Sequence, residues 1–217
     1  MSVSSRLSRL GLMLFTAVAV LASGCAQMAT YNASYHGSPN TQPADKLPGK
    51  VLVLTDKVDD DTPFVGAPTS FTGGGTKLTI PLGVIAREIG AVVFGDLFRD
   101  GAVKANTIAA ASGFRVAVTP RVKAFSYEYN QAKNAGFAIT PTVILTLEVT
   151  TQDNTGKALR TRTYESGTVE MPAYMISGSP GEEIGKAAHK AIYDLMVKAA
   201  ADLRNDFRTS GSPALAL

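Results

Sequence analysis

The chain has 217 residues, with 45% hydrophobic and 18% charged side chains and a formal charge of +3. That length suits one folded domain, and so modest a charge does not indicate a dedicated nucleic-acid binder. A single cysteine excludes an internal disulfide or a multi-cysteine metal site, and two histidines leave little for a metal centre or a histidine-based triad.

Residues 1–24 have the layout of an export signal. Two arginines supply positive charge near the start, an apolar run spans Leu10 to Ala22, and small residues lead to Cys25. The run is shorter than the roughly 20 residues that a bilayer-spanning helix needs. A signal peptide that is removed on export is therefore favoured over a permanent membrane span.

This segment resembles the signal of bacterial lipoproteins, in which small residues precede a lipid-modified cysteine. The resemblance implies cleavage after Gly24, a diacylglycerol on the thiol of Cys25 and an acyl chain on its amine. Leu21 lies four residues before Cys25, where the family favours three. The residue after the cysteine is Ala26 and not aspartate, which by the sorting rule of enterobacterial lipoproteins implies the outer membrane. The alternative is an ordinary secreted protein with a chance cysteine at its cleavage site.

Removal of the signal takes two arginines with it and lowers the formal charge from +3 to +1. The net charge gives no electrostatic argument for a nucleic-acid partner or for an anionic surface. Residues 25–49 then form the lipidated cysteine and a segment rich in Ala, Ser, Asn, Pro and Gly, without helical or alternating periodicity. This composition predicts a flexible tether, in which His36 is a solvated linker residue.

Residues 50–208 are predicted to form a single domain. The apolar run 51–54 indicates a buried strand. Residues 57–75 indicate a long loop, and the acidic triplet at 59–61 lacks the spacing of a calcium-binding loop, so a solvated turn is favoured. Apolar residues at three- and four-residue spacing predict a helix over 82–99.

The second half of the domain begins with strands. Residues 114–118 and 125–129 alternate in polarity, with Pro120 interrupting between them, and 143–151 and 159–166 form an antiparallel hairpin around a polar turn. An apolar stripe then predicts a helix over 180–208, in which His189 lies among charged residues and is expected at the surface. Residues 209–217 are expected to be a disordered tail. The element order predicts an α+β fold, a two-layer sandwich of an antiparallel sheet with two helices packed on one face.

No catalytic constellation assembles along the chain, because a nucleophile, a base and an orienting group do not occur together in a recognisable motif. We therefore expect no enzyme activity, and we predict no cofactor and no metal site. An enzyme built on a carboxylate pair stays open, since spacing in sequence does not report distance in space.

Two features suit binding. Phe125, Tyr127 and Tyr129 form an aromatic row on one strand, which either packs under a helix or forms a partner-contact surface. The hairpin carries polar side chains, for which cross-strand pairing on a solvated face is the ordinary explanation. They are Arg160, Arg162, Thr146, Glu148 and Thr150.

The stretch FRVAVTPRVKAFSYEYNQ, the segment TTQDNTGKALRTRTYESG and the alanine-rich helix that follows resemble the YajG-type bacterial lipoproteins. The resemblance covers residues 114–208. It implies the same two-layer fold as the auxiliary lipoproteins of lipid-exporting ABC transporters, and it carries no catalytic residues.

These observations lead to one favoured hypothesis. The protein is a lipoprotein anchored in the outer membrane with its domain facing the periplasm. It acts as a non-enzymatic interaction module in envelope biogenesis or lipid transport, and it docks a periplasmic partner through its sheet edge or its aromatic strand. The alternative is a carrier that binds a lipid or another small apolar ligand between helices and sheet.

Overall fold

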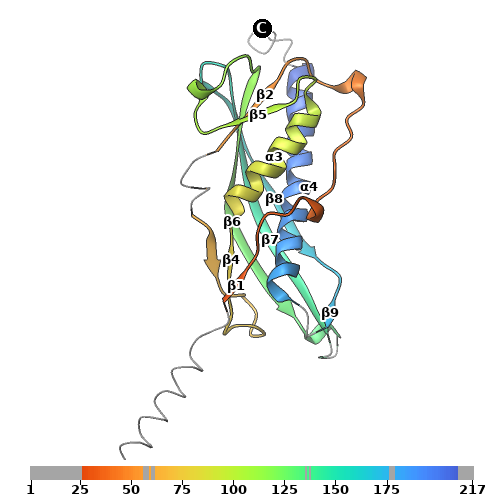
Figure 1. The fold of residues 1–217 in the computed structure, drawn as a ribbon. Coiled ribbons are helices and arrows are strands. Elements are labelled where there is room, and N and C mark those ends of the chain that lie inside the picture. Colours follow the sequence, from red (N-terminus) through yellow and green to blue (C-terminus); the bar gives the residue numbers. More distant parts are fainter. Residues whose placement is uncertain are drawn as a thin grey trace, which may run out of the picture.

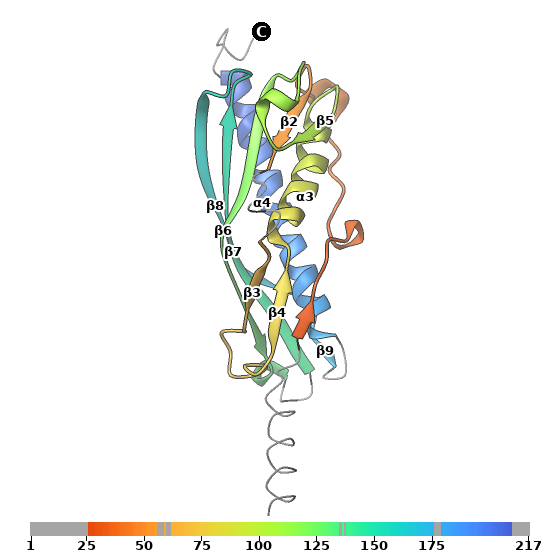
Figure 2. The same ribbon diagram turned by 60° about the vertical axis from the view of Figure 1, so that its left-hand side comes forward.

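The computed structural model describes residues 26–55, 59, 62–134, 136, 138–175 and 179–209. Cys25, the signal sequence and residues 210–217 lie outside the described residues. A long, mixed sheet forms one layer of the domain, and two helices cover one of its faces (Figure 1). A small three-stranded sheet continues the sheet layer toward the end where the described chain begins (Figure 2). The α+β class is confirmed.

The large sheet has the strand order β5-β2-β6-β7-β8, with the short β9 paired to β7. The strands are β2 (Val51–Leu54), β5 (Ala102–Ala105), β6 (Val116–Asn130), β7 (Ala138–Gln152), β8 (Ala158–Glu170) and β9 (Tyr174–Met175). The sheet was predicted to be antiparallel. It is mostly so, and it is mixed at one end, where β2 pairs in parallel with both β5 and β6. A parallel pair needs a long crossover connection, and the first helix lies between β2 and β5 in the chain.

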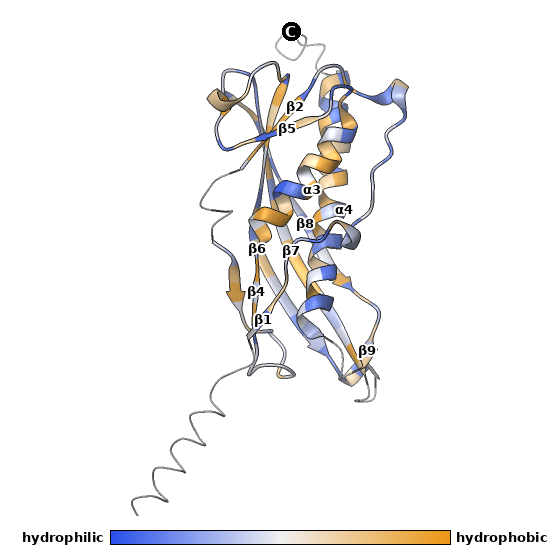
Figure 3. Cartoon of the chain, in the orientation of Figure 1, coloured by the Kyte–Doolittle hydropathy of each residue, from blue (hydrophilic) through white to orange (hydrophobic). Residues whose placement is uncertain are grey.

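Helix α3 (Leu82–Leu97) and helix α4 (Pro180–Thr209) confirm the two predicted helices to within two residues at each end. Their apolar stripes are buried against the sheet. The fully buried members include Ile85, Ile89, Ile184, Ala188, Ala191 and Ile192. Figure 3 shows apolar residues in β2, in α3 and along α4, which together form the core with the inward side chains of β7.

β6 runs without a break through Pro120, where the sequence predicted an interruption. Pairing between β2 and β6 ends at Val53 and Val118, so no strand lies beside β6 at Pro120 on that edge. A proline is tolerated at such a position because no neighbouring strand needs its missing N–H. The β7–β8 hairpin is confirmed, with the Oδ1 atom of Asp153 accepting from the backbone N–H groups of Thr155 and Lys157 in its turn.

The region predicted as one long loop contains a strand, β3 (Phe64–Gly66), which pairs with β4 (Lys77–Ile80). The third member of this small sheet is β1 (Ala26–Met28), which runs parallel to β4. Three-residue strands flanked by glycine and proline give too short a pattern for periodicity to detect.

Residues 26–49 are also not the detached tether that their composition predicted. The segment crosses α4 and then runs along the helical layer to the far end of the domain (Figure 1). Ala29 and Leu47 are buried, and the backbone N–H of Thr41 donates to Asp96 of α3 over 2.7 Å. A few well-placed contacts hold a segment that has no hydrophobic pattern of its own.

Candidate functional site: an exposed sheet edge pinned to a helix

The aromatic row is mostly core: Tyr127 and Tyr129 are buried and Phe125 is half-buried, so its interpretation as an exposed partner-contact surface is wrong for the two tyrosines. Tyr127 and Tyr129 are 2% and 3% exposed. The ring of Phe64 on β3 packs at 5.0 Å from that of Phe125, and the hydroxyl of Tyr127 donates to the carbonyl of Gly66 over 2.9 Å. The physical reason is β3 itself, which covers the row. Burial raises the pKa of Tyr127 and Tyr129, as expected for phenols without solvent.

The two histidines, expected in a solvated linker and on the surface of the last helix, meet where the amino-terminal segment packs on α4. His189 is fully buried, and the rings of His36 and Tyr31 stack near it, with centroids at 6.4 and 5.6 Å. The Nε2 atom of His189 accepts from the backbone N–H of Asn32, and its Nδ1 atom hydrogen-bonds the carbonyl of Gly185. Helical spacing offered a signal for this burial, because His189 follows Gly185 by one turn and lies next to Ala188 of the apolar stripe.

Both ring nitrogens of His189 are therefore in use. Nε2 must be unprotonated to accept, and Nδ1 must carry the proton to donate, so the ring is neutral and fixed in one tautomer. Burial lowers the pKa of His189, which favours the same neutral form. A ring held in this way fastens the amino-terminal segment to α4 and is not a free base. Among the described residues, no group of three or more His, Cys, Asp or Glu side chains is placed to hold a metal ion.

The interface between α4 and β7–β8 is filled around Phe94. The space between α4 and β7–β8, next to Phe94, Val149 and Leu203, has a volume of only about 10 Å³. That is the room of a single water molecule at most, whereas sites for drug-sized ligands measure roughly 300 Å³ or more. A depression of about 680 Å³ opens on the opposite face of the sheet, but threonine, amide and charged side chains line most of it. Neither of these two spaces suits the predicted apolar carrier site. A pocket of about 340 Å³ at the start of α3, beside Phe64, Leu82 and Phe125, and a groove of about 410 Å³ between α4 and β8, beside Val169 and Leu195, have the size of a site for a small ligand.

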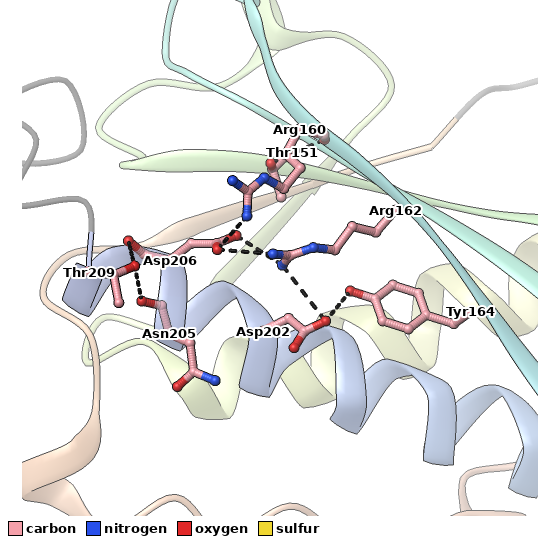
Figure 4. A network of polar contacts seen from close by, with 8 residues as sticks. All are labelled: Thr151, Arg160, Arg162, Tyr164, Asp202, Asn205, Asp206 and Thr209. Carbon is pink, nitrogen blue, oxygen red and sulfur yellow. Dashed lines mark hydrogen bonds and ion pairs between the residues drawn. The ribbon is translucent and has the colours of Figure 1, made fainter.

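A polar network joins β8 to α4 (Figure 4). The guanidinium of Arg162 donates to both carboxylate oxygens of Asp206, over 2.9 and 3.1 Å, and Arg160 donates to the same carboxylate over 2.7 Å. One turn earlier on the helix, Asp202 accepts from the hydroxyl of Tyr164 over 3.0 Å. Burial, with the hydrogen bond to Asp202, raises the pKa of Tyr164 to about 12, so this hydroxyl keeps its proton.

The sequence grouped Arg160 and Arg162 with Thr146, Glu148 and Thr150 on one polar face, and the structure separates them. Arg162 is opposite Val149 in the β7–β8 register, on the face that packs against the helices. The Thr150 hydroxyl instead pairs with that of Thr161 on the open face. The arginines make their ion pairs with α4 and not across strands, because β8 extends the sheet under the last turns of that helix.

β8 is the outer strand of the large sheet, and its 13 residues are mostly exposed. The carbonyl of Arg160 accepts a hydrogen bond from the Thr151 hydroxyl and so faces β7. Because backbone groups alternate in direction along a strand, those of Thr161 and Thr163 face away from the sheet. Such an edge is a template for another strand, and native proteins usually shorten or cover it. Here α4 fixes the strand and leaves its outer edge open.

The first described residues of the chain are also held against the domain. β1 begins at Ala26, the residue after Cys25, and Ala26 is in register with Lys77 of β4. Farther along, Ala29 lies so close to α4 that a Cβ added at Gly185 would be 3.0 Å from the Ala29 Cβ. The described chain therefore starts at a defined position on the domain. No described helix combines the length and the apolar character that crossing a membrane would require.

Comparison with known proteins adds three distant likenesses in fold. No family model matches the chain. No curated protein matches it either. A PelC dodecamer from Paraburkholderia phytofirmans is 16% identical, with a TM-score of 0.34 over 74% of this chain and 93% of that one. A minor lipoprotein from Acinetobacter baumannii is 15% identical, with a TM-score of 0.31 over 72% and 93%. A putative neuraminyllactose-binding hemagglutinin homolog from Helicobacter pylori is 8% identical, with a TM-score of 0.35 over 79% and 89%.

Proposed function

We propose that this protein is a lipoprotein of the bacterial outer membrane, anchored through Cys25 with its domain in the periplasm. The domain is a non-enzymatic interaction module that binds another envelope protein in envelope biogenesis or lipid transport. The partner adds a strand to the outer edge of β8.

The observation that carries this proposal is the open edge of β8, held rigid by the carboxylates of Asp202 and Asp206. Strand addition gives affinity through main-chain hydrogen bonds and specificity through side chains on alternate faces. A pinned edge also costs a partner less ordering entropy than a mobile one. Of the two docking surfaces that the sequence suggested, the aromatic row has both tyrosines buried and Phe125 half-buried, whereas β8 is mostly exposed along its length.

The location is supported by residues 1–25, whose charge, apolar run and small residues lead to Cys25, and by the resemblance of residues 114–208 to YajG-type lipoproteins. The space between α4 and β7–β8 near Phe94 is too small for a carrier site, so the carrier alternative depends on the pocket at the start of α3 and the groove between α4 and β8.

The test is position-specific crosslinking in cells that make the full-length protein. A photoreactive residue at Thr163 reports on the edge, and one at Lys198, exposed on α4, is the matched control. We expect one envelope protein to be captured from Thr163 and not from Lys198. Equal capture from both positions, or none from Thr163, would contradict a partner at this edge.

A proline at the same position separates edge binding from general damage. Thr163→Pro removes an outward N–H without removing a β7–β8 hydrogen bond, so the fold should survive. We expect the proline to abolish partner capture from a second photoreactive residue at Thr161, and Thr163→Val, which keeps the N–H, to preserve it. Unfolding curves of both variants provide the control for stability.

A further inference from the structure

We propose that the loop between β3 and β4 contacts the membrane surface, with Phe71 seated among the lipid headgroups and upper acyl chains. This inference rests on the proposed anchor at Cys25. It adds that the domain lies directly on the bilayer in one orientation and does not stand away from it.

Phe71 is fully exposed, at 103% of its reference area, which is unusual for so large an apolar side chain. The loop that presents it is held in place. The backbone N–H of Thr69 donates to the carbonyl of Tyr127 over 2.9 Å, and the Ser70 hydroxyl accepts from the backbone N–H of Tyr129 over 2.9 Å. The exposure of Phe71 is therefore a property of an ordered loop fastened to the edge of β6.

The same end of the domain carries further exposed apolar side chains. Met28 and Val65 are both in register with Thr79 of β4, one on each side, and both are exposed. Met175 on β9 is exposed as well, and β9 lies at this end beside the start of β7 (Figures 1 and 2). Together with Phe71, these residues are exposed apolar side chains that lie at one end of an elongated molecule.

The charge of the β3–β4 segment suits an anionic lipid surface. Residues 62–80, which contain β3, the loop and β4, include no aspartate or glutamate, and Lys77 is their one charged residue. Lys77 is exposed and is paired in register with Ala26. A basic side chain close to a membrane surface is attracted by anionic headgroups, whereas a carboxylate there would be repelled.

The position of the proposed lipid anchor favours a membrane, and not a protein partner, as the surface that Phe71 contacts. Cys25 directly precedes Ala26, the first residue of β1, in the sequence, and one peptide unit spans about 3.8 Å. Lipids attached there must enter the bilayer beside Lys77 and the β3–β4 loop. An interfacial aromatic side chain at this end then orients the domain, because lipid chains by themselves fix only one point.

The chain contains no tryptophan, so Phe71→Trp introduces a single tryptophan at the loop, whose emission can be excited apart from that of the tyrosines. The lipidated protein is purified from membranes and reconstituted into vesicles of phosphatidylethanolamine and phosphatidylglycerol, with or without phosphatidylcholine brominated in the upper acyl chain. The matched control is Leu159→Trp, a partly exposed apolar residue beside the β7–β8 turn at the opposite end. Flotation of each sample in a density gradient reports on anchoring separately.

We expect both variants to float with the vesicles. The emission of Phe71→Trp should shift to shorter wavelength and be lost on quenching by brominated lipid, while that of Leu159→Trp stays unquenched. Flotation with equal quenching at the two positions, or with none at Phe71→Trp, would overturn the membrane contact and leave the anchor intact. Failure of both variants to float would overturn the anchor and, with it, the contact that depends on it.

Discussion

The backbone N–H of Asn32 donates a 3.0 Å hydrogen bond to Nε2 of His189, across 157 residues of chain. This bond joins the amino-terminal segment to the middle of α4, at the point where Tyr31 stacks on the histidine ring with centroids 5.6 Å apart. Its consequence is mechanical. The residue that follows Cys25 cannot move independently of the domain, so a lipid anchor at Cys25 would fix the position of the whole sheet edge relative to the membrane.

Replacing His189 with alanine should destabilise the protein by about 2–4 kcal/mol, because the change leaves a cavity and removes the acceptor of the Asn32 N–H. His36→Ala is the matched control, since that ring is only partly buried, and it should cost less than about 1 kcal/mol. Urea unfolding curves give both values. Faster proteolysis within residues 30–40 should accompany the first change and not the second.

Acidification should loosen the same contact. Burial lowers the pKa of His189 below 6.5, and the neighbouring His36 acts in the same direction, while the hydrogen bond to Gly185 opposes them. The folded state thus binds fewer protons than the unfolded state just below pH 6.5. The stability due to this group is fully present above that pH, and it is lost as the pH falls through 6.5 toward the folded pKa.

For one proton, the loss cannot exceed about 1.4 kcal/mol per pH unit. The measurement is the free energy of unfolding of the wild type and of His189→Gln between neutral and mildly acidic pH, where the carboxylates are still ionised. The difference between the two proteins should shrink as the pH falls. A constant difference would show that His189 keeps the same pKa in both states.

Tyr127 should behave as a core residue. Tyr127→Ala is expected to cost about 3–5 kcal/mol, because a ring that is 2% exposed leaves a cavity between β6 and β3. Tyr127→Phe keeps the ring and loses only the hydrogen bond to the carbonyl of Gly66, for about 1 kcal/mol. Partner capture by folded Tyr127→Phe should equal that of the wild type. Reduced partner capture by this variant would support a direct contact between the aromatic row and the partner.

Asp206 accepts from both arginines, so its loss should free the edge strand. Asp206→Asn is expected to lower stability by about 1–2 kcal/mol, a small value because Arg160 and Arg162 are partly exposed and regain water. High salt should reduce the difference in unfolding free energy between Asp206→Asn and the wild type, because salt screens the ion pairs. Amide hydrogen exchange at Thr161 and Thr163 should rise more than at residues 143–149 of β7. Asp194→Asn, which breaks an exposed pair with Lys190 on the same helix, is the control.

The elements that the sequence predicted correctly are those in which a periodic pattern of apolar residues is long or the turn residues are specific. The 16 residues of α3, the 30 of α4 and the hairpin turn at Asp153 each repeat a period or carry specific turn chemistry, and all three occur as expected. The errors lie where the local pattern is short or neutral. β3 has three residues, and the segment 26–49 has few apolar side chains, so neither showed that it packs on the domain.

The same limit applies to the candidate site. The hairpin pattern predicted that β8 pairs with β7, but it did not predict that β8 is the outer strand of the sheet. The alternation from Phe125 to Tyr129 was equally compatible with a core row and with a surface row. Burial of that row depends on β3, and the ion pairs of Arg160 and Arg162 depend on α4 crossing that part of the sheet. Neither partner is near in sequence.

By itself, the sequence determined the helices, the hairpin, the α+β class and the expectation of a lipid at Cys25, because local periodicity and the order of a few neighbouring residues specify each of them. Tertiary structure decided which side chains are accessible. Burial depends on segments far apart in the chain, such as Asn32 on His189 or Phe64 on Phe125. Alternation of polarity along a strand predicts that the two faces of the strand differ. Which face and which edge of the sheet are exposed to water depends on the segments that pack against it.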